Sequence, residues 1–381
     1  MQAIYSFQNN IKKIGWLNVW WQNIDRVTLG LVATLMTIGL ILSFGSSPAA
    51  AARLDYDNPF FFVYRQAFFV AISFSILISI SFLSIDNVRR FSLLLYVISI
   101  VLLITILGIG HTAKGAQRWL RFGGFSLQPS EIIKPAAIIL VSWVLTRRVY
   151  DKGFHAEFVG LAIVAFPIMI FLMQPDVGQT FLLSISYLAI FWVAGISRKW
   201  LLGLFGTSIV GVILLFLFKP HFVDRIDKFI NPENNDNYQV DRGLDAIASG
   251  EIFGRGAGEG IIKHILPDVH TDFIFSLAVE EWGMIGAFFL MSLFAILIIR
   301  GIHVASKISD PFAQTSGIGL YLLFGFQVAI NLAVNLNLIP AKGMTLPFIS
   351  YGGSSLIGSA ITLGLALAIT RKRPYEAVLR K

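Results

Sequence analysis

The chain contains no cysteine among its 381 residues. This absence excludes a disulfide, a thiolate metal site and a thiol nucleophile. Charge is scarce too, because Asp, Glu, Lys and Arg make up 14% of the residues, against about 25% in ordinary soluble domains. Hydrophobic residues make up 56% of the chain, which is more than one soluble core can bury. The composition therefore indicates an integral membrane protein.

Ten apolar runs are long enough to cross a bilayer, which takes about 20 helical residues for about 30 Å of hydrocarbon. Backbone groups in lipid must be satisfied within their own segment, so we expect helices. The predicted fold class is an all-α integral membrane protein with about ten transmembrane helices and a large extracytoplasmic loop between helices 7 and 8. The expected spans are residues 27–44, 60–83, 91–109, 130–146, 158–173, 181–196, 201–218, 273–299, 312–336 and 356–370.

These spans divide the chain into three parts. Residues 1–26 form a cytoplasmic or interfacial segment, residues 27–370 a polytopic membrane domain with the large loop at 219–272, and residues 371–381 a basic cytoplasmic tail. Over half of the 30 Lys and Arg residues lie in short loops or ends that share one side in this arrangement. Cytoplasmic loops are rich in Lys and Arg, so both termini are expected in the cytoplasm. The net charge of +8 needs no nucleic acid, since anionic lipid attracts the same residues.

The first fifty residues leave two alternatives open. Ala49, Ala50 and Ala51 follow basic residues and an apolar run, as in a cleaved signal peptide. Nine further spans follow, which favours a retained first span. Upstream, Trp16, Trp20 and the residues around them suit a helix lying in the inner interface, with an unstructured tail as the alternative.

Polar residues gather in two stretches around the third, fourth and fifth spans. The loop at 111–129 carries Lys114, Arg118 and Arg121 on the predicted outer side, where an anionic ligand would explain them. The next helix opens Gln128-Pro129-Ser130-Glu131 with Lys134 three residues later. We expect Ser130 to cap this helix, and Glu131 with Lys134 either to mark function or to form a structural ion pair. Asp176, in the Gln-Pro-Asp run after the fifth span, suits a turn or a site.

Two more stretches lie later in the chain. Glycines from Gly254 to Gly260 lack the G-x-G-x-x-G spacing of a dinucleotide site, so we expect a flexible turn or a backbone nest for phosphate. Asp272 then follows His270 and Thr271 at the seam between the polar loop and an apolar run; a helix N-cap is its alternative role. Residues 340–355 are too rich in Pro and Gly for a helix and too apolar for a free loop, which predicts irregular backbone buried or lining a cavity.

In this order on a ten-span chain, the four stretches resemble the SEDS family of peptidoglycan glycosyltransferases, the shape, elongation, division and sporulation proteins. The resemblance covers roughly residues 27–374, and the run Lys-Gly-Met-Thr-Leu-Pro from Lys342 to Pro347 is more similar to the cell-division members than to the rod-shape members. It implies polymerisation of lipid II on the outer face of the cytoplasmic membrane during septal wall synthesis. The implied partners are lipid II, a class B penicillin-binding transpeptidase and divisome regulators. A lipid II flippase or transporter, an elongation role and a scaffold that only docks an enzyme are the alternatives.

The resemblance maps the essential aspartate of the family onto Asp272. Joining two sugars requires a base for the attacking hydroxyl and cations for the departing pyrophosphate, so Asp272 is the expected base and Arg118, Arg121, Lys134 and Lys342 the expected pyrophosphate ligands. No protein metal cage is visible in the sequence, so Mg²⁺ or Mn²⁺ would be shared with the pyrophosphate of the substrate. The full set of expected substrate-binding residues is Lys114, Arg118, Trp119, Arg121, Gln128, Ser130, Glu131, Lys134, Asp176, His270, Thr271, Lys342, Thr345, Ser350, Tyr351, Gly352, Gly353 and Ser354.

Overall fold

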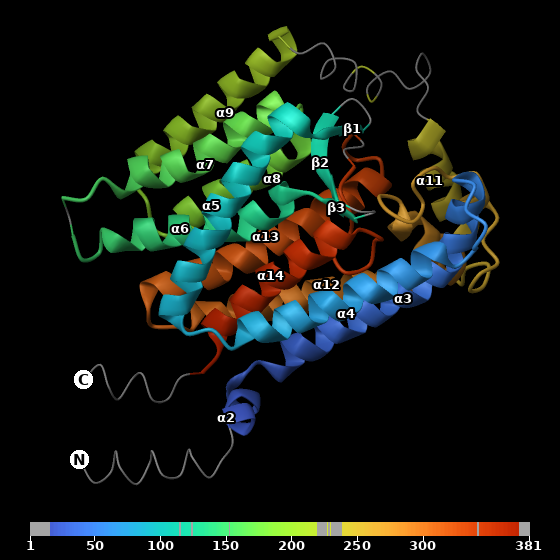
Figure 1. Ribbon diagram of the computed structural model, residues 1–381, viewed down its shortest axis with the longest axis horizontal. Coiled ribbons are helices and arrows are strands. Elements are labelled where there is room, and N and C mark those ends of the chain that lie inside the picture. Colours follow the sequence, from blue (N-terminus) through green and yellow to red (C-terminus); the bar gives the residue numbers. More distant parts are fainter. Residues whose placement is uncertain are drawn as a thin grey trace.

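The computed structural model describes residues 16–113, 116–122, 125–151, 153–218, 238–340 and 343–372, together with 227 and 229. It is predominantly helical (Figure 1). Among the described residues, eight helices are long and apolar enough to cross a membrane. They are α3 (Arg26–Arg53), α4 (Phe61–Ser81), α5 (Ile85–Ile109), α6 (Pro129–Arg147), α7 (Ala156–Met173), α12 (Ile274–Ser306), α13 (Pro311–Asn335) and α14 (Gly353–Thr370). The predicted helical membrane fold is therefore confirmed.

The two remaining predicted spans also lie on helices. They correspond to α8 (Val177–Val193), a shorter apolar helix, and α9 (Arg198–Phe218). Each of the ten predicted runs thus has a helix of its own, while a count of ten membrane crossings stays a prediction. The helix α3 continues past the predicted end at residue 44, through Pro48 to Arg53. The Ala49–Ala51 stretch is buried within this helix, which favours a retained first span over a cleaved signal peptide.

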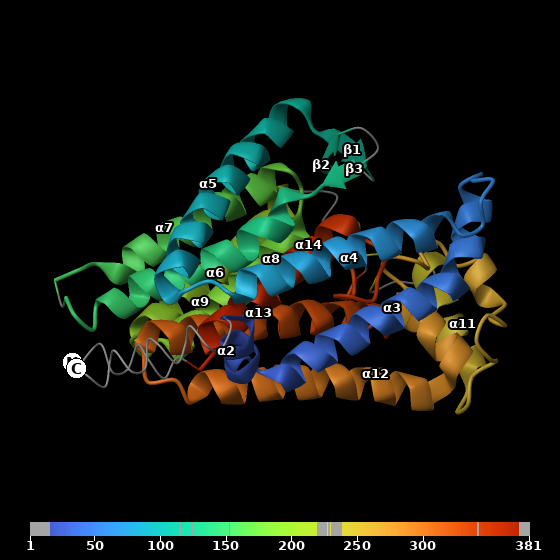
Figure 2. The ribbon, with the colours of Figure 1, turned by 60° about the horizontal axis from the view of Figure 1, so that its bottom comes forward.

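The helices α6, α13 and α14 form the centre of the bundle. In α6 and α14, 83% of the most apolar 18-residue stretch is buried, against 22–33% of the corresponding stretch in α4, α5, α7 and α12. Figure 2 shows α13 and α14 between α12 on one side and α5 on the other. Small residues bring α14 close to its neighbours: a Cβ on Gly358 would lie 2.8 Å from the backbone oxygen of Glu131 on α6. Such close backbone approach is how helices associate where lipid removes the hydrophobic driving force.

Polar contacts close one end of the bundle. Arg300, near the end of α12, pairs with Asp25 before α3 at 2.8 Å, and the backbone N–H of Lys372 donates to the carbonyl of Asn23 at 3.1 Å. The Arg371 guanidinium donates to the carbonyl of Phe82, beyond the end of α4. Residues assigned to one side of the membrane by the charge rule therefore lie together at one end of the molecule.

Several elements were not predicted. A three-stranded antiparallel sheet of β1 (His111–Ala113), β2 (Ala116–Phe122) and β3 (Phe125–Leu127) links α5 to α6. The described part of the large loop contains α11 (Tyr238–Gly250) and the 3₁₀ turn η2 (Ile262–His264). By contrast, the helix predicted around Trp16 and Trp20 is present as the short α2 (Trp16–Asn23), which precedes α3. The helix α12 bends at Gly283, where φ is +69°. A side chain there would be strained and would meet the carbonyl of Ile252 at 2.3 Å.

Candidate active site

A cavity of about 370 Å³ opens at the end of the bundle that carries the sheet and α11. Segments far apart in the sequence supply its walls: α4, β2, β3, the start of α6, α8, α11, the loop before α12, α13 and the irregular segment after residue 342. The lining residues are Arg65, Phe69, Arg118, Trp119, Ser126, Gln128, Glu131, Gln179, Gln239, Thr271, Asp272, Phe273, Gln327, Val334, Gly343, Met344, Thr345, Tyr351, Gly352, Gly353 and Ser355. All four polar stretches of the sequence therefore meet at or beside one cavity.

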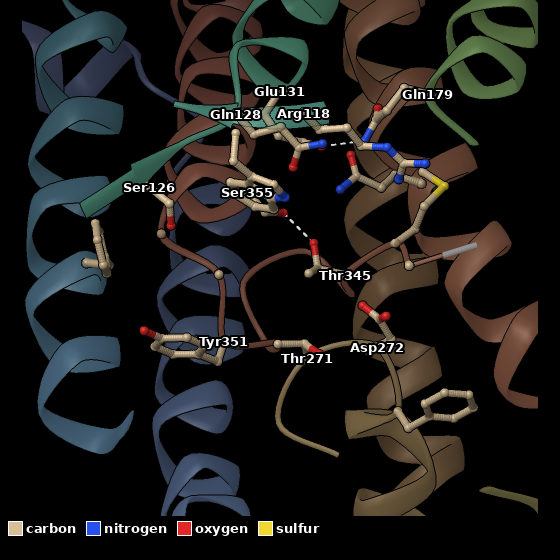
Figure 3. A pocket seen from close by; sticks show the side chains of 18 of the residues that line it. Arg118, Ser126, Gln128, Glu131, Gln179, Thr271, Asp272, Thr345, Tyr351 and Ser355 are labelled. Atoms are coloured by element: carbon tan, nitrogen blue, oxygen red, sulfur yellow. Dashed lines mark hydrogen bonds between the residues drawn. The ribbon is translucent and has the colours of Figure 1, made fainter. Parts of the chain in front are cut away.

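Asp272 lies in the last turn of the loop before α12, and its carboxylate points into the cavity. Figure 3 shows it facing the wall that carries Arg118, Glu131 and Gln179. The helix begins at Ile274, and its N-cap is Phe273 without a side-chain cap bond. The alternative that Asp272 serves as a helix N-cap is therefore wrong. The buried ring of Phe273 forms part of the wall beside it.

Two asparagines of α13 hold the backbone at Asp272. The side-chain amides of Asn331 and Asn335 both donate to the carbonyl of Asp272, at 3.0 and 2.9 Å. Asn331 also donates to the carbonyl of Met344 at 2.6 Å. A single buried amide thus joins the aspartate loop to the irregular segment. The sequence analysis missed these residues, although polar residues four apart in an apolar span, as at Gln327, Asn331 and Asn335, form one helix face and usually mark function.

The irregular segment from Gly343 to Gly352 is clamped between the other stretches. The Ser350 hydroxyl donates to the carbonyl of Thr271 at 2.5 Å and accepts from the Leu346 N–H at 2.8 Å. The N–H of Tyr351 donates to the carbonyl of His270. Most of this backbone is buried, and several of its residues line the cavity, as the sequence predicted for residues 340–355.

Serine and threonine side chains extend this clamp to the sheet and to α14. The Ser354 hydroxyl donates to the carbonyl of Ser126 in β3 and accepts from the N–H of Gln128 before α6. The Thr345 hydroxyl donates to Ser355 at 2.6 Å. Ser350, Ser354 and His270 are not among the lining residues. The first two therefore hold the cavity wall in place.

A buried polar cluster lies at the inner wall of the cavity. Glu131 and Lys134 form the predicted ion pair at 2.9 Å, with 5% and 2% of their side chains exposed. The other Glu131 oxygen accepts from the Gln179 amide at 2.7 Å, and Lys134 also donates to the Gln327 carbonyl oxygen. Lys134 is not among the lining residues. Its charge is compensated by Glu131, before any ligand arrives. Of the two alternatives, the geometry favours a structural ion pair between Glu131 and Lys134.

Arg118 and Asp176 belong to one unit. The Arg118 Nε lies 3.4 Å from Asp176 Oδ2, and its Nη2 donates to the carbonyl of Pro175 at 3.0 Å. Asp176 caps α8 by accepting from the Gln179 N–H, and burial raises the pKa of its carboxyl, against the effect of Arg118. Asp176 does not line the cavity. Its position as the cap of α8 favours the turn role over direct contact with a ligand. It orients Arg118, which does line the cavity.

Arg65 is a lining cation that the sequence analysis did not single out. It lies in the first turns of α4, and its guanidinium stacks on the ring of Phe61 with 5.5 Å to the ring centroid. Burial raises the pKa of the neighbouring Tyr351, and the charge of Arg65 opposes this shift. A lone arginine near the end of an apolar run was the available signal. Among the described residues, Arg65 and Arg118 are the basic residues of the wall.

Other predicted site residues lie elsewhere. Arg121 is exposed on β2 and is not among the lining residues. Ser130 is buried in the first turn of α6 but does not cap it, because the N-cap is Gln128 and no side chain caps this end. The expected serine cap is therefore wrong. Lys114 and Lys342 lie outside the described residues.

The backbone that directly follows the glycine-rich stretch binds a carboxylate of the chain itself. The backbone N–H groups of Ile261 and Ile262 both donate to Glu280 Oε1 at 2.7 Å, and that of Lys263 donates to Oε2 at 3.2 Å. Glu280 is completely buried. Within the glycine-rich stretch itself, the N–H groups of Arg255 and Gly256 donate to the carbonyls of Glu280 and Glu281, which favours the predicted turn over a phosphate nest there.

The described residues contain no cluster of three or more His, Cys, Asp or Glu side chains that could hold a metal ion. A divalent ion at this site would need oxygen ligands from a bound substrate, and Asp272 and Glu131 are the carboxylates of the wall.

Comparisons with known proteins agree with this architecture. A family model for cell cycle proteins of the FtsW, RodA and SpoVE type matches residues 25–375. The chain is 46% identical to the probable peptidoglycan glycosyltransferase FtsW of Caulobacter vibrioides, over 94% of this chain and 92% of that protein. It is 35% identical to the stage V sporulation protein E of Bacillus subtilis, over 92% and 98%.

Two solved structures share the fold. A chain from a peptidoglycan synthase complex, described as coordinating polymerization and crosslinking, gives a TM-score of 0.74 with 27% identity, covering 91% of this chain and 97% of that chain. The rod shape determining protein RodA of Thermus thermophilus gives 0.67 with 26% identity, covering 93% and 99%. With the family model matching nearly its whole length, this chain belongs to the FtsW/RodA/SpoVE family of cell cycle proteins.

Proposed function

We propose that this chain is a peptidoglycan glycosyltransferase that polymerises lipid II into glycan strands on the outer face of the cytoplasmic membrane during cell division. The observation that carries the proposal is the position of Asp272, whose carboxylate faces a polar cavity that also holds Arg65 and Arg118. The relatives named as probable FtsW glycosyltransferases support the same activity. They also favour the division role over an elongation role.

The reaction joins a sugar hydroxyl to an anomeric carbon and releases a lipid pyrophosphate. Asp272 takes the proton of the attacking hydroxyl while the new bond to the anomeric carbon forms. The bond from that carbon to the pyrophosphate oxygen breaks, and the departing charge is stabilised by the guanidinium groups of Arg65 and Arg118. Guanidinium suits this task because its planar donors bind phosphate oxygens in pairs. A Mg²⁺ or Mn²⁺ ion shared with the substrate would supply further positive charge for the departing group.

The walls of the cavity suit a sugar as well as a phosphate. The amides of Gln128, Gln179 and Gln239 line it together with hydroxyl groups, and the aromatic side chains of Trp119 and Tyr351 add flat apolar surface. Amides and hydroxyls both donate and accept hydrogen bonds, as sugar hydroxyls do. These groups therefore suit the sugar part of the proposed lipid pyrophosphate substrate.

The proposal extends to orientation and partners. The end of the bundle with the cavity faces outward, and the end with Arg300 and Arg371 faces the cytoplasm with both termini, because basic residues concentrate there. A class B penicillin-binding transpeptidase that crosslinks the product is the proposed partner, alongside divisome regulators. The relative from a complex that polymerises and crosslinks peptidoglycan supports this pairing.

Purified protein supplied with lipid II tests the function. The wild type should form glycan strands, and Asp272→Asn should reduce the rate by at least about 100-fold, the lower range for loss of a general base. The backbone contacts of Asp272 with Asn331 and Asn335 do not depend on the carboxylate, so this variant should stay folded. Asp57→Asn, at an exposed site between α3 and α4, is the matched control. Normal polymerisation by Asp272→Asn would refute the assignment, and lipid transfer across vesicles without polymerisation would favour a flippase.

A further inference from the structure

Glu280 closes the base of the chain segment that carries Asp272. Its carboxylate accepts three backbone hydrogen bonds, from Ile261 and Ile262 at 2.7 Å and from Lys263 at 3.2 Å. Asp272 lies nine residues after Lys263 and eight before Glu280. The segment between these ends, which includes the first turns of α12, is therefore a closed loop of the chain with the proposed base near its middle.

The neighbouring residues show that this closure is built for a carboxylate. A Cβ on Gly260 would lie 2.9 Å from the Glu280 carboxyl carbon, so the absence of a side chain there leaves room for the group. The N–H groups of Arg255 and Gly256 donate to the carbonyls of Glu280 and Glu281. Next to it, Lys263 pairs with Glu281 at 2.8 Å, with 3% of each side chain exposed.

The charge of the Glu280 carboxylate is compensated differently from that of Glu281. Glu281 is paired with a lysine, whereas the Glu280 carboxylate accepts from three backbone N–H groups in the described part of the chain. A carboxylate with two oxygens can accept all three bonds, while a glutamine offers one oxygen and an NH₂ group that cannot accept. A glutamine at position 280 would therefore lose the backbone bonds on the side of its NH₂ group and close the loop only in part.

We propose that Glu280 is a positioning residue that sets the place of Asp272 by fixing both ends of this loop. The inference rests on the proposed function, in which Asp272 is the base. Glu280 is completely buried and is absent from the cavity wall, so it acts through the backbone. The lipid-binding residues Arg65 and Arg118 belong to other elements. Loss of the closure should therefore reduce turnover more than substrate affinity.

Steady-state polymerisation by Glu280→Gln tests this proposal. We expect kcat to fall by roughly 10- to 100-fold, because small displacements of a catalytic group have effects of this size, while KM stays within about threefold. Glu259→Gln is the matched control, since it makes the same change at an exposed site of the same loop. Gly260→Ala, which places a methyl group against the carboxylate, should give the same pattern with the charge retained.

Hydrogen exchange of the backbone amides at 261–272 supplies a second measurement that needs no activity. Exchange there should be faster in Glu280→Gln than in the wild type, with exchange in α6 and α14 unchanged. A kcat equal to that of Glu259→Gln, or a loss expressed only in KM, would overturn the positioning role. If the wild type itself forms no glycan while exchange at 261–272 responds as expected, the proposed function fails and the closure of the loop stands.

Discussion

The contact between Asn331 and the aspartate loop allows a quantitative prediction for Asn331→Leu, which replaces a buried amide by an apolar group of similar size. The change removes the bonds to the carbonyls of Asp272 and Met344. The Asp272 carbonyl keeps its bond from Asn335 at 2.9 Å, so of these two carbonyls it is that of Met344 that loses its side-chain donor. One buried unsatisfied carbonyl costs about 1–3 kcal/mol. We expect a loss of stability in that range.

Activity should respond more strongly than stability. Asn331 joins the loop of Asp272 to the segment of Gly343 and Thr345, which form adjoining parts of the wall. Without this link we expect polymerisation to fall by roughly 10- to 100-fold. Thermal unfolding in detergent and lipid II polymerisation would be measured on the same preparation. Asn87→Leu, at an exposed site in the first turn of α5, is the control. If Asn331→Leu matches this control in both assays, the asparagine does not hold the site.

Three further predictions concern the anion site, the buried cluster and the topology. Arg118→Ala should weaken both lipid II binding and turnover, and Arg118→Lys should restore only part because the paired donors are lost; unchanged binding in the alanine variant would leave Arg118 with a structural role alone. Glu131→Gln leaves Lys134 buried without its counter-ion, so thermal stability should fall by several degrees, consistent with a loss of a few kcal/mol, whereas an unchanged unfolding temperature would show that Gln327 suffices for the lysine. Because the chain has no native cysteine, Ala257→Cys should react with a membrane-impermeant thiol reagent in spheroplasts and Ser306→Cys only after lysis; reaction of both before lysis contradicts the proposed orientation.

The helices could be predicted from the sequence because hydrocarbon imposes one simple requirement on each span. Every apolar run long enough to cross the membrane became a helix, and errors were confined to the ends, as at α3, where small residues carry the helix through Pro48 to Arg53. The sheet was missed because its strands are three to seven residues long. The Gly123-Gly124 pair between two of these strands was a hairpin signal in the sequence. The bend at Gly283 depends on contact with Ile252, which no local pattern reveals.

The candidate site could be predicted only where its contacts are local. Glu131 and Lys134 are three residues apart on a helix, so their pairing follows from spacing. Arg118 and Asp176 are separated by two helices in the sequence. No sequence pattern indicates that the Asp176 carboxylate would orient the Arg118 guanidinium. The same holds for Glu280: the backbone donors that bind its carboxylate, at Ile261 to Lys263, lie just outside the glycine-rich stretch of the prediction and almost twenty residues before Glu280 in the chain.

The contacts of the wall explain why an irregular backbone can persist at the depth of the membrane. Each unsatisfied carbonyl there would cost several kcal/mol in hydrocarbon, and side chains of neighbouring helices satisfy the critical ones: Asn331 bonds Met344, and Gln66 bonds Ser350. These bonds fix the wall before a substrate arrives, so little reorganisation is needed when charge develops on a departing pyrophosphate. A buried amide in α4 or α13 therefore contributes to the reaction without touching the substrate. Its removal should change the rate even where every residue of the cavity wall is intact.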